Sequence, residues 1–301
     1  MTTQLDLNDF AVGTVVITAR RTITDTDIIS FAGLSGDFNA LHVDDLFAKE
    51  VSPSGTRIAH GQLIGSVVTG LRSRLDDWPI LSYLGAKRSF LSPVLAGDTI
   101  HGRYEVTECR PSKSRADRAI VILSVEVLNQ NGDRVMSGTD TMLLGPGSLS
   151  EDRAGPIYLE DIPDNHSFGT SRRSLSEADI VSFCAITGDH SPLHTDLTFI
   201  AKETPFKEKI AQGWLALSIQ SGLRSEIDRW RILAYLEAER NFRTPAYPGD
   251  TLEAKYQVTE IRRSKSKPDR GIVRLLCKVL NQNGEVVQDG YEAFLVATRP
   301  A

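Results

Sequence analysis

Apolar residues recur at every fourth position in two segments of the chain, which predicts two helices that each bury one face. The two stripes are Leu63, Val67, Leu71 and Leu75 in the first segment, and Leu215, Ile219, Leu223 and Ile227 in the second. After each segment the pattern changes to stretches rich in β-branched residues, which contain the hairpin dipeptides Asn131-Gly132 and Asn283-Gly284. Each helix is therefore expected to precede an antiparallel sheet.

A shorter helix is predicted ahead of each stripe. Thr24 with Asp27, and Ser176 with Asp179, form the capping-box pattern with which many helices begin. A polar, turn-forming segment follows each short helix and carries an aspartate and a histidine. The order of predicted elements is thus the same in both halves of the chain.

The two halves are copies of one another. A shift of 152 positions places FAGLSGDFNALHVD (31–44) on FCAITGDHSPLHTD (183–196), and VLNQNG (127–132) on VLNQNG (279–284). Such self-similarity without insertions indicates a duplicated domain. We predict a first repeat at 1–145, a linker at 146–163 and a second repeat at 164–301. The linker is rich in Gly, Pro, Ser and acidic residues, which favours an exposed connection.

The predicted fold class is α+β, with a central helix against an antiparallel sheet in each repeat. Two such units side by side could pair their edge strands and so hide edges that would otherwise aggregate. A monomer that is itself a pseudo-dimer and a homodimer both agree with this arrangement.

Composition and charge exclude several classes of protein. The 301 residues are 41% hydrophobic and 24% charged, as in soluble globular proteins. A net charge of −5 gives no basic footprint for nucleic acid, and the sequence has neither a membrane-spanning apolar run nor a signal-peptide pattern. The three cysteines, Cys109, Cys184 and Cys277, are too few and too scattered for a disulfide framework or a zinc site. We expect a cytoplasmic protein.

The candidate chemistry lies in the turn-forming segments. Asp37 and His42 are five residues apart, and Asp189 and His194 repeat the spacing. A carboxylate with an ordinary pKa of about 3.9 and an imidazole of about 6.5 form a natural acid–base pair at neutral pH. A turn between them could aim both groups at one water molecule. An aspartate in such a turn is also common for purely structural reasons.

The segment FAGLSGDFNALH (31–42) resembles the signature of MaoC-like hydratases, the (R)-specific enoyl-CoA hydratases. The family pattern is G-D-x-N-P-[LIV]-H, and Ala40 replaces its proline. Ala59-His60-Gly61 resembles the start of the family's central helix, and the resemblance covers essentially all of both repeats. It implies a double hot-dog fold, in which each sheet wraps around its central helix.

The resemblance also implies roles for individual residues. Asp37 and His42 would orient and activate water, and Asn39 would support that pair or the substrate carbonyl. The backbone N–H of Gly61 would stabilise the thioester oxyanion, which suits the positive end of a helix dipole. The implied reaction is reversible syn addition of water across a 2-enoyl thioester to give the (3R)-hydroxyacyl product, in fatty acid metabolism.

The implied substrate is an acyl-CoA or an acyl chain on a carrier protein. Coenzyme A enters only as part of that substrate, and no metal or other cofactor is expected. Nucleic acid and membrane are not expected as partners. Two alternatives stay open, namely a hot-dog thioesterase and a non-catalytic acyl-binding protein.

The second copy changes the supporting residues. Ser191 stands where the first copy has Asn39, and Gln212 stands where it has His60, while Gly213 is retained. Either both sites work, or the second has drifted at its support residues only. The replacement by Gln212 favours reading His60 as a residue without a chemical role.

Two basic segments, RPSKSRADR (110–118) and RRSKSKPDR (262–270), are predicted to be loops between strands. Their cations could attract the phosphates of coenzyme A, and a solvated charged loop is the alternative. The candidate phosphate contacts are Lys113, Arg118, Lys265 and Arg270.

Overall fold

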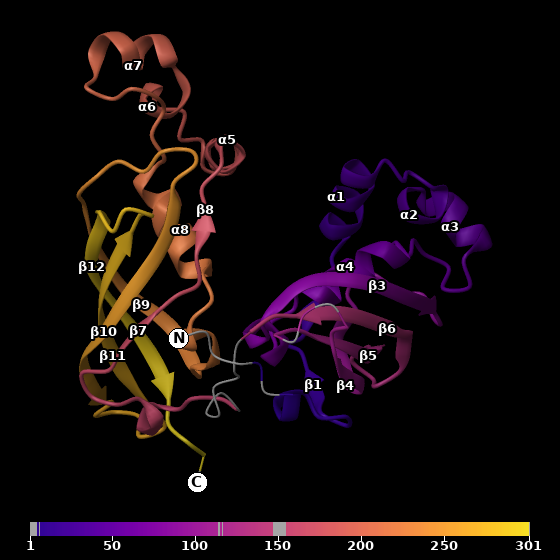
Figure 1. Cartoon of the computed structure of the whole chain (residues 1–301). Helices are drawn as coiled ribbons and strands as arrows, with labels where there is room; N and C mark the ends of the chain where they lie inside the picture. The colour runs from indigo at the N-terminus through magenta and orange to yellow at the C-terminus, as the bar shows by residue number, and fades with distance from the viewer. Residues whose placement is uncertain (1–4, 6, 114, 116, 147–154, 301) are drawn as a thin grey trace. The chain divides into compact units, whose positions relative to one another are not determined.

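The computed structural model describes residues 5, 7–113, 115, 117–146 and 155–300. The chain divides into two compact units, 1–154 and 155–301, which Figure 1 shows in indigo to magenta and in rose to yellow. Residues 147–154 of the predicted linker lie outside the described part. The rest of the predicted linker differs from the expectation, because Leu159 and Ile162 are buried in the core of the second unit. Residues 155–163 therefore belong to that unit.

The first unit contains an antiparallel six-stranded sheet in the order β1-β4-β5-β6-β3, with β2 paired to β4. Its elements are η1 (Leu7–Phe10), β1 (Val15–Ile17), β2 (Arg21–Thr22), α1 (Asp25–Ser35), α2 (Ala40–Val43), α3 (Asp45–Val51), α4 (Gly61–Gly70), η2 (Arg74–Asp77), β3 (Ile80–Phe90), β4 (Thr99–Pro111), β5 (Ala119–Leu128) and β6 (Arg134–Leu144). Helix α4 lies against the sheet, and α1, α2 and α3 lie on the side of α4 away from it (Figure 1).

The second unit repeats this arrangement in a sheet of order β7-β10-β11-β12-β9, with β8 paired to β10. Its elements are η3 (Leu159–Asp161), β7 (Ser167–Gly169), β8 (Arg173–Ser174), α5 (Glu177–Thr187), α6 (Pro192–Thr195), α7 (Leu197–Glu203), α8 (Gly213–Gly222), η4 (Glu226–Arg229), β9 (Ile232–Phe242), β10 (Thr251–Arg263), β11 (Arg270–Leu280) and β12 (Val286–Ala297). The predicted hot-dog arrangement, a helix wrapped by an antiparallel sheet, is confirmed in each unit.

The predicted capping boxes are present at the starts of α1 and α5. Both helices end at a glycine in the left-handed conformation, Gly36 with φ 76° and Gly188 with φ 75°. A residue with a Cβ atom adopts this conformation only at a cost, whereas glycine adopts it freely. The turn ends the helix and places the next residue, Asp37 or Asp189, at the start of the loop.

The central helices are shorter than the apolar stripes that predicted them. Helix α4 ends at Gly70, and a new capping box of Ser73 and Asp76 begins the 3-10 turn that carries Leu75. The stripe residues are nevertheless buried as a set, and they pack against the inner face of the sheet. The periodic pattern therefore predicts the buried face correctly and the end of the helix incorrectly.

Strand β5 and the first part of β4 alternate buried and half-buried residues, as expected for a sheet with one face on a core. The two Asn-Gly hairpins are confirmed and use the same turn, with Gly132 and Gly284 at positive φ and equivalent backbone hydrogen bonds. Strands β3 and β9 each form one edge of their own sheet. The edge pairing expected from the sequence stays a prediction.

No helix in the described ranges is both long and apolar enough to cross a membrane. The three cysteines are free thiols. Burial raises the pKa of the Cys277 thiol to about 12, which makes that thiol unreactive at neutral pH.

Candidate functional site

The loop after α1 is held in shape by short local hydrogen bonds. The backbone N–H of Asn39 donates to Asp37 Oδ1 at 3.2 Å, and the Leu41 N–H donates to Asn39 Oδ1 at 3.0 Å. Asn39 is thus the N-cap of α2, the short helix that carries His42. The asparagine expected to support the pair does so by fixing the backbone between its two members.

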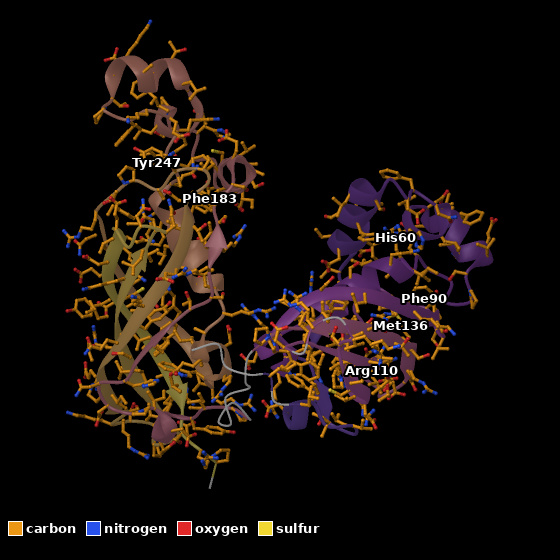
Figure 2. The ribbon with its side chains drawn as sticks, viewed as in Figure 1. His60, Phe90, Arg110, Met136, Phe183 and Tyr247 are labelled. Carbon is orange, nitrogen blue, oxygen red and sulfur yellow. The ribbon has the colours of Figure 1, made fainter. Side chains whose placement is uncertain are left out.

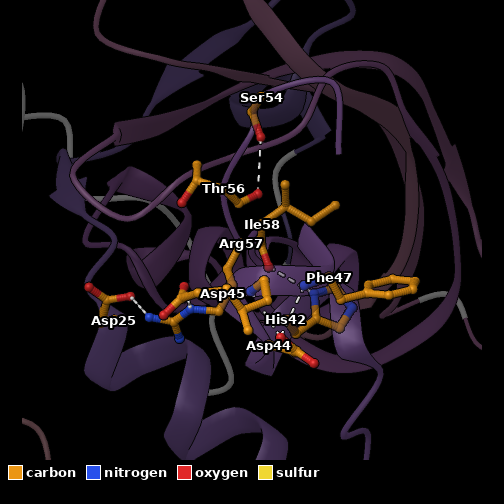
Figure 3. A network of polar contacts seen from close by, with 10 residues as sticks. Asp25, His42, Asp44, Asp45, Phe47, Ser54, Thr56, Arg57 and Ile58 are labelled. Atoms are coloured by element: carbon orange, nitrogen blue, oxygen red, sulfur yellow. Dashed lines mark hydrogen bonds and ion pairs between the residues drawn. The ribbon is translucent and has the colours of Figure 1, made fainter. Parts of the chain in front are cut away.

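His42 is oriented by a backbone carbonyl. Its Nδ1 lies 2.8 Å from the oxygen of Ile58, and Figure 3 shows this contact. Because a carbonyl oxygen only accepts, Nδ1 must carry the proton, and a neutral ring then has an unprotonated Nε2. The segment that supplies the carbonyl is itself tied down, since Arg57 pairs with Asp45 at 2.6 Å and with Asp25 at 3.0 Å. His42 can therefore act as a base through Nε2.

His60 lies directly behind the pair. Its ring stacks on that of His42 with centroids 3.7 Å apart, and its Nε2 lies 2.9 Å from the backbone oxygen of Asp37. The side chain is buried, and its Nδ1 has no hydrogen-bond partner among the described residues. His60 therefore contacts both members of the pair, and the expectation that it has no chemical role stays a prediction.

The same three residues form a candidate metal cluster, since one ligand atom from each lies within 4.8 Å of the others. Their geometry fits an ion poorly. The rings of His42 and His60 are stacked 3.7 Å apart at an interplanar angle of 27°, so their in-plane lone pairs lie in nearly parallel, separate planes, whereas a metal needs ligands that converge on one point. The expectation of no metal stays a prediction.

Gly61 is the first residue of α4. Its backbone N–H belongs to the first turn, where N–H groups have no acceptor within the helix and the dipole favours negative charge. A Cβ atom at this position would lie 2.7 Å from Cε1 of Phe90. Glycine therefore allows close approach to the N-terminus of the helix.

His42 and Gly61 open onto a cavity of about 560 Å³ whose wall is mostly apolar. Its lining includes His42 and Gly61 together with Ile58, Ile64, Phe90, Leu91, Val94, Val135 and Met136. Phe90 and Met136 are paired across β3 and β6 and lie side by side in Figure 2. The sequence did not predict that Val135 and Met136 line the cavity, because their orientation toward it depends on a β-bulge between β5 and β6.

In the second unit, Asp189 Oδ2 lies 3.9 Å from Nε2 of His194. The Nδ1 of His194 lies 2.7 Å from the oxygen of Ile210, which orients this ring in the same way as in the first unit. The backbone N–H of Ser191 donates to Asp189 Oδ1 at 3.3 Å, but the Ser191 hydroxyl makes no capping hydrogen bond. The pair is preserved while its support is weaker.

Gln212 occupies the position of His60 in the second unit and forms a different hydrogen bond. The Nε2 of Gln212 donates to Cys184 Sγ at 3.1 Å, and its Oε1 has no partner in the described part of the chain. Gly213 begins α8 as Gly61 begins α4, and a Cβ atom there would lie 2.3 Å from Cε1 of Phe242. In both units, a phenylalanine of the edge strand thus packs against the first residue of the central helix.

The basic loops are not brought to the site of their own unit. The loop with Lys113 and Arg118 joins β4 to β5 at one end of the sheet, whereas Val135 and Met136 of the cavity lie at the other. The ten residues of β5 separate the two ends, a length of about 30 Å. In the second unit the equivalent loop carries Lys265 and Arg270.

Within that second loop, Arg270 already pairs with the adjacent Asp269 at 2.7 Å. Inside one unit, these cations do not reach the cavity that His42 and Gly61 line. Their proposed phosphate contacts gain no support from the fold of that unit.

Comparison with known proteins identifies the family. The MaoC like domain matches residues 9–127 and again residues 162–278, so the chain belongs to this family and carries its domain twice. It is 32% identical over 155 residues to the 3-hydroxybutyryl-CoA dehydratase of Methylorubrum extorquens, which covers 52% of this chain and 91% of that protein.

Two further relatives are similar over one repeat. The (R)-specific enoyl-CoA hydratase of Aeromonas caviae is 34% identical over 112 residues, 37% of this chain and 79% of that protein. Protein MaoC of Klebsiella aerogenes is 34% identical over 130 residues, and the match spans 40% of this chain and only 38% of that protein.

Proposed function

We propose that the chain catalyses the reversible hydration of 2-enoyl-CoA thioesters to (3R)-hydroxyacyl-CoA thioesters. The observation that carries the proposal is that the oriented imidazole of His42 and the N-terminus of α4 open onto one apolar cavity. The names of the relatives from Methylorubrum extorquens and Aeromonas caviae supply the substrate class. A base, an oxyanion site and an apolar acyl pocket are the three parts that such a reaction requires.

In the proposed reaction, a water molecule binds between the Asp37 carboxylate and Nε2 of His42. His42 removes a proton as the water oxygen forms a bond to C3, and the electron pair of the double bond moves toward the thioester oxygen. The backbone N–H of Gly61 holds that oxygen while it carries negative charge. The proton then passes from the pair to C2 on the same face, which completes syn addition and restores both side chains.

The same reaction is proposed for Asp189 and His194 in the second unit, with Gly213 in the role of Gly61. Neither site is proposed to use a metal or a redox cofactor, because the proton returns to the substrate. Coenzyme A is the handle of the substrate and takes no part in bond making.

The test is a spectroscopic hydration assay with crotonyl-CoA and longer trans-2-enoyl-CoA thioesters. Loss of the absorbance of the conjugated thioester with retention of the thioester bond supports the proposal. Release of free thiol instead would identify a thioesterase. Tight binding of acyl-CoA without turnover of any of these thioesters would identify a non-catalytic acyl-binding protein.

A further inference from the structure

A buried amide in the second unit has no partner. Gln288 on β12 is fully buried, and neither its Oε1 nor its Nε2 has a hydrogen-bond partner among the residues that the structure describes. Leaving such a group unpaired is costly, because it has lost its hydrogen bonds to water and gained none in return. An apolar residue of similar size would avoid this cost, and the first unit has one at this position, Met136.

The position of Gln288 is equivalent to a wall of the acyl cavity. In the first unit, β5 and β6 change register between Val127 and Leu128, so that Val135 and its neighbour Met136 both line the cavity. A bulge of this kind turns two successive residues of one strand toward the same side. Strands β11 and β12 have the same change of register, between Val279 and Leu280.

The neighbours of Gln288 also match those of Met136. Gln288 is paired with Phe242, as Met136 is paired with Phe90. Phe242 in turn lies against Gly213 at the start of α8. The unpaired amide therefore lies on the side of the sheet that faces the N-terminus of the central helix, next to the phenylalanine that covers the oxyanion position.

We infer that the second unit binds acyl thioesters whose acyl chain carries a hydroxyl group beyond C3, and that the amide of Gln288 is the hydrogen-bond partner of that hydroxyl. The inference rests on the proposed function and specifies the substrate class of its second site. The first unit, with Met136 in this place, binds chains that are plain hydrocarbon beyond C3. The two copies then act on different members of one class of substrate.

The chemistry of the surrounding residues favours a neutral group over a carboxylate. An amide offers one donor group and one acceptor, and a hydroxyl complements both. Arg243 replaces the cavity residue Leu91 in the second unit, but its guanidinium makes two hydrogen bonds to Asp289, both of 3.0 Å. This ion pair leaves no net positive charge to attract an anion.

The experiment measures binding to the full chain by calorimetry, in the wild type, in Gln288→Met and in the matched control Met136→Gln. The ligands are hexanoyl-CoA and its derivatives with one hydroxyl at C4, C5 or C6, because the 3-hydroxy derivative is the product of the proposed reaction at either site. These thioesters have neither a double bond at C2 nor a hydroxyl at C3, so the proposed reaction can neither hydrate nor dehydrate them and the result does not depend on catalysis. We expect one hydroxylated member to bind the wild type with at least about tenfold preference over hexanoyl-CoA, as one hydrogen bond to an otherwise unpaired amide gives.

Gln288→Met should abolish this preference, and Met136→Gln should create a second site that shows it. Equal binding of all members of the series to the wild type would overturn the inference while leaving the proposed function intact. Absence of binding by every acyl-CoA would overturn the proposed function and the inference with it.

Thermal unfolding without ligand gives an independent readout. Gln288→Met should raise the melting temperature, because it removes an unpaired buried amide, and Met136→Gln should lower it. A fall in melting temperature for Gln288→Met would mean that the amide is already satisfied, by a buried water for example. That result would make Gln288 a structural residue and overturn the inference.

Discussion

Both repeats contain the aspartate–histidine pair, but different residues contact it in each. The imidazole of His42 is oriented by the Ile58 carbonyl at 2.8 Å, and that of His194 by the Ile210 carbonyl at 2.7 Å. Next to the pair, however, the first unit has His60 stacked on His42, whereas the second has Gln212 hydrogen-bonded to the thiol of Cys184. The hydrogen bond that orients the histidine is therefore the same in both units, and the residue next to the pair, His60 or Gln212, differs.

The difference indicates which parts of the site tolerate change after duplication. Without the backbone carbonyl that accepts from Nδ1, the histidine would no longer be fixed in the tautomer with an unprotonated Nε2. A change at Gln212 or Gln288 leaves that hydrogen bond in place. If the proposed function holds, such changes alter the rate and the choice of substrate without removing the chemistry. We therefore expect two active sites of unequal rate and different specificity.

Removing both carboxylates is the change with the largest expected effect. Asp37→Asn with Asp189→Asn should lower kcat for enoyl-CoA hydration by about 10²–10⁴, the range for loss of general acid–base catalysis. Each single variant should report the rate of the remaining site, measured by the loss of conjugated-thioester absorbance. If Asp37→Asn alone removes all turnover, the second site is inactive and the comparison fails.

A buried ion pair offers the next largest effect. Arg240 and Glu292 are almost completely buried and paired in the second unit, and Arg88 and Asp140 are paired at 2.7 Å in the first. Arg240→Met should lower the free energy of unfolding by about 3–5 kcal/mol, because it leaves a buried carboxylate without its partner. Urea denaturation measures the loss, and Arg240→Met with Glu292→Leu should recover most of it.

The loss from Arg240→Met should depend on pH. Burial raises the pKa of Glu292 above its ordinary value while Arg240 opposes the shift, so the loss of Arg240 should raise this pKa further in the variant. A raised folded-state pKa gives a contribution to stability that is complete below the unfolded pKa, about 4.3, and is lost as the pH rises through the folded value. The deficit of the variant relative to the wild type should therefore shrink as the pH falls from 7 toward 4. A deficit independent of pH would show that the carboxylate does not cause it.

Crowding the helix N-terminus should give an intermediate effect. Gly61→Ala and Gly213→Ala place a methyl group against Phe90 and Phe242. Both rings are more than half exposed and can turn aside, so the fold should survive. The displaced ring and the added methyl should hinder the approach of the thioester oxygen and lower kcat/KM of the affected site by about 10², comparable to loss of one oxyanion donor. Circular dichroism checks that folding is unchanged.

Exchanging the residues behind the pair should have the smallest effect and sharpen the comparison most. His60→Gln should lower kcat of the first site by about tenfold with little change in KM, because small misplacements of catalytic groups slow the reaction. Gln212→His, tested in an Asp37→Asn chain, should raise the rate of the second site. Equal rates in all these variants would mean that the stacked histidine does not position the pair.

The pattern of the sequence was sufficient to predict the fold and the centre of the site. The stripe through Leu63 and Val67, the capping box at Thr24 and the repeat of 152 positions depend on local spacing, which a sequence displays directly. The stripe did not show that α4 ends at Gly70, because Ser73 begins a new turn while the next apolar residue remains in phase.

Contacts through space could not be predicted in the same way. A backbone carbonyl such as that of Ile58 has no signature in a side-chain pattern. Lys113 and Arg118 have suitable charge for phosphates, but only the strand order shows that their loop lies at the far end of the sheet. The exchange of Met136 for Gln288 is visible in the repeat, but its meaning depends on burial and on unpaired atoms that the sequence does not reveal.

The hydrogen bonds between Gly36 and His42 limit how this loop can change in length. The Gly36 N–H donates to Ala32, the Phe38 N–H to Gly36, the Asn39 N–H to Asp37, and the Leu41 and His42 N–H groups both donate to Asn39. Each of these bonds spans only two to four residues, so an insertion or deletion anywhere in the loop would break at least one of them. Divergence in this segment can proceed by substitution alone, and residues 31–44 align with 183–196 without a gap.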